Sequence, residues 1–110
     1  MTLELWQAEW CPASRRVRQR LTELGVDYVI RQVPVERDER EVLRAATGED
    51  VVPALTGAGE RPLLGEEEIL RWLDDRLPEP PGAAAHRIKA AKARRRFLEE
   101  ECGCEPAPTP

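Results

Sequence analysis

The chain has few cysteines, few aromatic residues and no long hydrophobic run. Three cysteines among 110 residues are too few, and odd in number, for a fold held together by disulfides. No apolar run approaches the roughly 20 residues of a membrane-spanning helix, and no signal sequence opens the chain. We therefore expect a cytoplasmic protein without membrane contact, whose cysteines act in catalysis, redox chemistry or metal binding, or stay inert.

An excess of positive charge is also missing. The 17 lysines and arginines stand against 21 aspartates and glutamates, which gives a formal net charge of −4. This balance carries no global sign of nucleic-acid binding, so we expect no nucleic-acid partner. The length suits one domain with a modest core.

One cysteine stands where a predicted strand meets a predicted helix. Residues 2–10 have the pattern of a strand, and residues 12–24 repeat apolar positions at helical spacing, with Pro12 first in the helix. Cys11 then lies at the helix N-terminus, where unpaired N–H groups and the macrodipole favour a thiolate and lower its pKa below about 8.5. Arg16, one turn further on, adds positive charge. The alternative is an inert, buried thiol.

The rest of the chain is predicted to consist of short strands and helices, followed by a tail. The predicted elements are strands over 27–35, 51–55 and 62–64, helices over 36–48 and 66–77, a proline-rich break over 78–82, a helix over 83–101 and a tail over 102–110. The first two strands are connected through a helix, so they are expected to be parallel. The last two are expected to be antiparallel across a glycine-rich turn.

Three short motifs mark this series. Glu-Trp-Cys-Pro-Ala-Ser ends at Ser14, Val-Val-Pro ends at Pro53, and Gly-Glu-Glu opens the helix over 66–77. With the element order, they make residues 1–77 resemble a monothiol glutaredoxin and the closely related N-terminal domain of glutathione transferases. The resemblance implies an α/β, thioredoxin-like (glutaredoxin) fold, with a four-stranded mixed sheet, flanking helices and an extra C-terminal helix. It also implies thiol–disulfide oxidoreductase activity.

The resemblance assigns the catalytic roles. Cys11 maps to the nucleophile, and Ser14 stands where dithiol members carry a second cysteine. Ser14 is either a hydrogen-bond donor to the thiolate or a solvent-facing residue of the first turn. Pro53 maps to the family proline that is cis and lies against the sulfur; the alternative is an ordinary edge-strand proline.

The resemblance also assigns a site for a small thiol. The backbone of Val52 would pair with the peptide part of a thiol tripeptide such as glutathione, and Glu66 and Glu67 would meet its γ-glutamyl end. The predicted thiol-ligand-binding residues are therefore Pro12, Val52, Pro53, Glu66 and Glu67. The thiol would be a co-substrate, with no tightly bound cofactor.

The chain departs from the family pattern at this site. Ala8 stands where members often carry a lysine, and two carboxylates crowd the γ-glutamyl end. Another low-molecular-weight thiol or a protein disulfide therefore stays open as the partner, and the protein is expected as a monomer or a dimer.

The other two cysteines form a closely spaced pair in the tail. Cys102 and Cys104 are candidates to resolve a mixed disulfide on Cys11, or they are two exposed reduced thiols. With the distant His86 they are too few for a zinc site within one chain, so no metal site is predicted. A zinc site shared across a dimer and an iron–sulfur cluster on Cys11 are minor alternatives. The basic helix around residues 86–96 is interpreted as a solvated face rather than a phosphate-binding one.

Two functions follow. The first is a thiol–disulfide oxidoreductase that uses Cys11 on mixed disulfides of a small thiol. The second is a non-catalytic module of the same fold that binds a thiol, a metal or a protein. A full glutathione transferase is disfavoured, because so short a chain has no room for the helical second domain that holds the electrophile.

Overall fold

The computed structural model describes residues 2–99, and for residues 97–99 the backbone alone. Cys102, Cys104 and the predicted tail therefore lie outside the described residues. The chain divides into a compact unit that ends at Pro78 and a second unit that begins at Glu79.

A mixed four-stranded sheet forms the centre of the first unit. Its strands are β1 (Leu3–Gln7), β2 (Tyr28–Gln32), β3 (Ala54–Thr56) and β4 (Leu63–Leu64), in the order β2-β1-β3-β4. The β1–β2 pair is parallel, as its helical crossover predicts, whereas β1–β3 and β3–β4 are antiparallel. The predicted α/β class and mixed sheet are confirmed.

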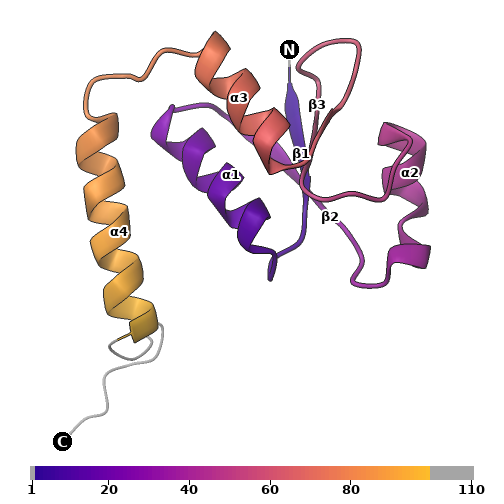
Figure 1. Ribbon diagram of the computed structural model, residues 1–110, viewed down its shortest axis with the longest axis horizontal. Helices are drawn as coiled ribbons and strands as arrows, with labels where there is room; N and C mark the ends of the chain where they lie inside the picture. Colours follow the sequence, from indigo (N-terminus) through magenta and orange to yellow (C-terminus); the bar gives the residue numbers. More distant parts are fainter. Residues whose placement is uncertain (1, 100–110) are drawn as a thin grey trace, which may run out of the picture. The chain divides into compact units, whose positions relative to one another are not determined.

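Three helices flank this sheet. They are α1 (Pro12–Glu23), α2 (Glu41–Thr47), which follows the 3₁₀ turn η1 (Arg37–Glu39), and α3 (Glu66–Arg76). Figure 1 shows α1 and α3 together on one side of the strands and α2 on the other. Side chains alternate along a strand, so each side of the sheet carries its own core.

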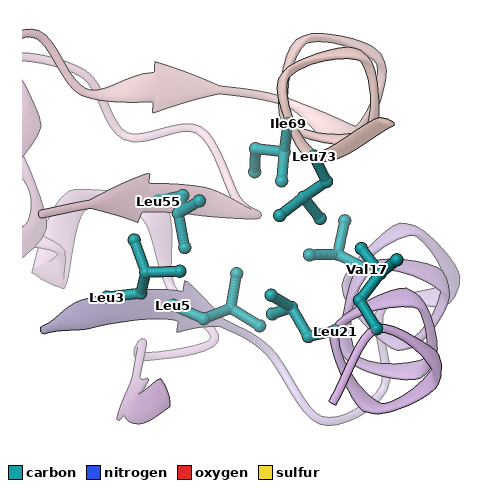
Figure 2. Packing of buried hydrophobic residues seen from close by; sticks show 8 residues of the cluster. Leu3, Leu5, Val17, Leu21, Leu55, Ile69 and Leu73 are labelled. Atoms are coloured by element: carbon teal, nitrogen blue, oxygen red, sulfur yellow. The ribbon is translucent and has the colours of Figure 1, made fainter. Parts of the chain in front are cut away.

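The larger core lies between the sheet and the α1–α3 pair. Figure 2 shows side chains of β1 and β3 pointing toward those of both helices. The buried members are Leu3, Leu5, Val17, Leu21, Leu24, Leu55, Ile69 and Leu73. Trp6 and Ala54, from the alternate positions of the strands, pack with Val33 and with Leu43 of α2 in a smaller cluster. Packing in the larger core holds α1 and α3 side by side, with their N-termini near each other.

One predicted boundary of the first strand–helix junction is wrong. The strand ends at Gln7 rather than at residue 10, because the chain turns there: the Cys11 N–H donates to the Ala8 carbonyl at 3.1 Å. Trp10 lies in this turn and is 56% exposed, so it does not belong to the strand. The turn brings Cys11 directly to the start of α1.

The helix predicted over 36–48 is divided in two. Arg40 interrupts it with a non-helical backbone, and its buried guanidinium donates to the carbonyls of Pro34, Val35 and Asp50. Those carbonyls need partners, and satisfying them outweighs helix continuity. The third strand also starts later than predicted, at Ala54, since Pro53 has no N–H to donate to a ladder.

The second unit contains one described helix, α4 (Ala83–Glu99). His86 is exposed on this helix, in agreement with the interpretation of the helix around residues 86–96 as a solvated face. No helix within residues 2–99 combines the length and apolar content needed to cross a membrane.

Candidate active site

Cys11 is the N-cap residue of α1. Its backbone is extended, with φ −78° and ψ 118°, and its Sγ accepts a hydrogen bond from the Ser14 N–H at 3.4 Å. Pro12 occupies the first helical position, where no N–H is required, and the first turn contains no acidic residue. The sulfur therefore sits at the positive end of the helix, where nothing on the same turn repels a negative charge.

Ser14 connects the end of β1 to the sulfur. Its side chain is buried, so the solvent-facing alternative is wrong. The Ser14 Oγ accepts a hydrogen bond from the Ala8 N–H at 3.3 Å. A backbone N–H can only donate, so the hydroxyl hydrogen remains available for Cys11, with which the Ser14 side chain is hydrogen-bonded.

The surroundings of the thiol favour its ionised form. Partial burial raises the pKa of Cys11, but hydrogen bonds from the Ser14 side chain and from the N–H groups of Ser14 and Ala13 lower it, as does the charge of Arg16. The net effect is a Cys11 pKa below its ordinary value. The sulfur-bearing residue is only partly buried. Together these properties count against an inert, buried thiol and are typical of a reactive cysteine.

Arg16 bridges to the third helix. Its Nε lies 2.8 and 2.9 Å from the two carboxylate oxygens of Glu66, and its Nη2 lies 2.7 Å from Oε2. This pair lowers the pKa of Glu66, and the hydrogen bond to Glu66 raises the pKa of Arg16. The start of α1 and the start of α3 are therefore joined beside Cys11.

Pro53 is tied to the same end of α3. The Val52–Pro53 peptide bond is cis, as the resemblance implies. The buried Pro53 accepts a hydrogen bond on its carbonyl from the N–H of Gly65, the N-cap residue of α3, at 2.9 Å. Val52 is partly buried against the smaller core, two residues before the start of β3.

A groove of about 690 Å³ opens at the N-terminus of α3. It is lined by Leu64, Gly65, Glu66, Glu67, Glu68 and Arg71. Glu67 is exposed here, whereas Glu66 is engaged by Arg16. The two glutamates predicted to meet a γ-glutamyl group thus both line a cavity, but Cys11 and Val52 do not line it.

The predicted site residues are linked by a series of contacts. Cys11 and Ser14 share the first turn of α1, Arg16 reaches from that helix to Glu66, and Gly65 joins α3 to Pro53. The predicted resolving pair, Cys102 and Cys104, lies outside the described residues.

Two side-chain contacts of α1 were not predicted. The Arg16–Glu66 pair joins residues 50 positions apart, which only the packing of α1 on α3 brings together. The second contact is made by Gln7, a buried residue at the end of β1 that accepts from Arg18 Nη1 of α1 and donates to Gln32 Oε1 at 2.9 Å. Because β1 also contains the charged Glu4, the polar character of Gln7 was no distinctive signal in the sequence.

Metal ligands do not converge in the part of the chain that the structure describes. Within residues 2–99, no three histidine, cysteine, aspartate or glutamate side chains come close enough to hold an ion.

Comparisons with known proteins identify the family. The family model described as the N-terminal domain of glutathione S-transferase matches residues 5–81 of this chain. A glutathione S-transferase from Rhodospirillum rubrum F11 is 28% identical, with a TM-score of 0.60 over 90% of this chain and 46% of the other. A rice glutathione S-transferase in complex with glutathione is 25% identical, with a TM-score of 0.60 over 90% of this chain and 45% of the other. A search of curated proteins gives no match.

A third structure shares the fold at lower identity. A possible glutathione S-transferase from Rhodopseudomonas palustris is 23% identical, with a TM-score of 0.60 over 91% of this chain and 54% of the other. The chain thus spans about half the length of these structures. Its thioredoxin-like fold is confirmed, and the chain belongs to the glutathione S-transferase N-terminal domain family.

Proposed function

We propose that this protein is a monothiol, glutaredoxin-like thiol–disulfide oxidoreductase that acts through Cys11 on mixed disulfides of a low-molecular-weight thiol such as glutathione. The observation that carries the proposal is the Cys11 sulfur at the N-cap of α1, hydrogen-bonded by Ser14 and partly exposed. A thiolate is the attacking species in thiol–disulfide exchange, and this position stabilises it.

The reaction exchanges one disulfide for another. The Cys11 thiolate attacks the small-thiol sulfur of a mixed disulfide and forms a Cys11–small-thiol disulfide. The original sulfur–sulfur bond breaks, and the substrate leaves as a thiolate that takes a proton from water. Ser14 and the helix N-terminus would stabilise Cys11 both as the attacking group and later as the leaving group.

A second thiol would complete the cycle. A free small thiol, as its thiolate, would attack the sulfur of the small thiol bound to Cys11, form the small-thiol disulfide and release the Cys11 thiolate. Alternatively, the thiolate of Cys102 or Cys104 would attack the Cys11 sulfur, which breaks the bond from Cys11 to the small thiol and releases the small thiol as its thiolate. Two external small thiols would then reduce the intramolecular disulfide and become oxidised to their own disulfide. In both routes the small thiol is the reductant.

Glutathione is the first thiol to test. The rice relative was solved in complex with glutathione, and the groove beside Glu66 and Glu67 would receive the γ-glutamyl end of such a tripeptide. Pro12 and the Val52–Pro53 segment would line the remainder, with the Val52 backbone pairing with the peptide as an added strand. We place the reaction in the cytoplasm, with protein mixed disulfides as partners.

The second candidate is a non-catalytic module that binds a thiol, a metal or a protein. It is favoured by one observation: the Glu66 carboxylate that the resemblance offers to a ligand is already held by Arg16 at two oxygens. A ligand ammonium group would then compete with a guanidinium.

A turnover assay separates the two. Cys11→Ser should abolish reduction of a glutathionylated protein by glutathione. Cys102→Ser/Cys104→Ser should retain turnover if a free small thiol completes the cycle, and lose it if the tail pair does. Peptide mass spectrometry after treatment with glutathione disulfide should find an adduct on Cys11, which either persists or gives way to a link with Cys102 or Cys104. Full turnover by Cys11→Ser would refute the proposal, and absence of both adduct and turnover in the wild type would favour the binding module.

A further inference from the structure

The two edges of the sheet differ in how far they are covered. β4 forms one edge with only two residues, and the N–H of its Leu64 donates to Glu68 Oε2 of α3 at 3.3 Å. β2 forms the other edge with five residues, and within residues 2–99 no strand lies beyond it. An edge strand presents a row of N–H and C=O groups that can pair with another strand. β2 is therefore the edge that is open to a further strand.

The backbone of β2 presents three residues to this open edge. The Val33 N–H, one residue past the end of the strand, donates to the Gln7 carbonyl of β1 at 3.1 Å. Successive residues of a strand direct their N–H and C=O groups to opposite edges, so the groups of Val29 and Arg31 also face β1. The residues whose N–H and C=O groups face outward are Tyr28, Ile30 and Gln32.

The side chains of β2 leave this edge unprotected. Natural edge strands are protected by proline, by bulges or by outward-pointing charges. β2 contains no proline, its register with β1 is continuous, and its one charged residue, Arg31, is directed across β1. Arg31 pairs with Glu4 Oε1 at 2.7 Å, and its guanidinium lies 6.0 Å from the centre of the Trp6 ring. The branched apolar residues Val29 and Ile30 are 40% and 41% exposed, so a partner strand would remove apolar surface from water.

We propose that β2 pairs with β2 of a second copy of this chain, antiparallel and centred on Ile30, so that the two sheets become continuous. A twofold axis requires a strand that is complementary to itself. In this register Ile30 lies opposite its own copy, Val29 lies opposite Arg31, and Tyr28 lies opposite Gln32. Every outward N–H of one copy then meets an outward C=O of the other, and no charge faces a like charge.

The residues that flank β2 favour this register over its neighbours. A shift in one direction would place an outward residue opposite Val26, whose N–H already donates to the Leu21 carbonyl at 3.0 Å. A shift in the other direction would place an outward residue opposite Pro34, which has no N–H to donate. The register centred on Ile30 is the one in which all three outward residues find complete partners.

The experiment measures sedimentation velocity of the whole chain in reducing buffer, which excludes dimers linked through a cysteine. The parent should change from monomer to dimer as its concentration rises from roughly 5 to 500 µM. Ile30→Pro removes an outward N–H and none of those that face β1, so it should fold and weaken dimerisation by at least about tenfold. Ile30→Lys retains that N–H but places like charges opposite each other, and it should also weaken dimerisation.

Val42→Lys is the matched control for loss of an exposed, branched apolar residue. Val42 lies on α2 and is 70% exposed, so this variant should dimerise as the parent does. Amide hydrogen exchange, measured residue by residue by NMR, provides a second readout. The Gln32 N–H should exchange slowly at high protein concentration and rapidly at low concentration, whereas the Arg31 N–H should exchange slowly at both.

Four results would overturn the pairing. They are a parent that stays monomeric over the whole range, a dimer that survives both Ile30 variants, a dimer that Val42→Lys weakens equally, and a Gln32 N–H that is protected at every concentration. The last result would mean that another part of the same chain covers β2. The pairing involves no cysteine, so it goes beyond the proposed oxidoreductase function, and either proposal can fail while the other stands.

Discussion

Two helix N-termini meet at this site, and they use the same electrostatic field differently. The first turn of α1 contains no acidic residue and is capped by the Cys11 sulfur, whereas α3 opens with three glutamates after Gly65, which provides no side-chain cap. Both ends attract negative charge. At the N-terminus of α3 the negative charge comes from glutamate carboxylates. At the N-terminus of α1 it comes from the Cys11 sulfur, which is charged only as a thiolate. The N-terminus of α3 is therefore neutralised by fixed charges, whereas that of α1 is available to stabilise a thiolate.

Ser14→Ala should have the largest effect, because it removes the buried contact that distinguishes the start of α1. The Ala8 N–H would lose its partner, which costs about 1–3 kcal/mol of unfolding free energy. The pKa of Cys11 should also rise, since the Ser14 side-chain hydrogen bond lowers it. Urea denaturation and alkylation against pH measure the two effects.

Thr22→Ala is the matched control for that substitution. Thr22 carries an exposed hydroxyl on the same helix, which donates to the Arg18 carbonyl at 3.0 Å. Its loss should change the unfolding free energy by less than about 0.5 kcal/mol. Equal destabilisation by both substitutions would contradict a special role for Ser14.

Ala13→Glu should make the start of α1 resemble that of α3. A carboxylate in the first turn of α1, two residues after Cys11, repels the thiolate, so alkylation of Cys11 near pH 6 should slow by about two- to fivefold. The neutral Ala13→Gln variant controls for side-chain size and should retain most of the parental rate. Equally slow alkylation in both variants would indicate a steric effect rather than an electrostatic one.

Raising the salt concentration should produce the smallest effect on the alkylation of Cys11. Because the pKa of Cys11 is lowered, the thiolate persists below the range of a free cysteine and is lost as the pH falls through the lowered pKa. At 1 M salt the contribution of exposed Arg16 is screened, whereas hydrogen bonds from Ser14 and Ala13 persist. The alkylation midpoint should therefore move slightly upward in salt but stay below that of free cysteine. A midpoint equal to that of free cysteine would contradict the stabilised thiolate.

Local patterns were sufficient to predict most of the elements. α1 begins at Pro12 and ends before Gly25, whose φ of +70° suits a glycine that follows a helix. The errors lie where distant groups compete with local preference. Arg40 breaks a predicted helix because carbonyls from two other segments take its guanidinium, and Trp10 leaves the predicted strand because the chain turns toward Cys11.

The sequence by itself determined which cysteine caps α1 and which residue donates a hydrogen bond to its sulfur. Cys11 and Ser14 lie three residues apart, so a single helical turn brings the Ser14 N–H to the sulfur wherever the helix packs. The Arg16–Glu66 pair and the Gly65–Pro53 hydrogen bond were decided by the tertiary structure alone. Their partners become neighbours because the buried leucines, Val17 and Ile69 pack α1 and α3 against one side of the sheet, a long-range arrangement that no local spacing encodes.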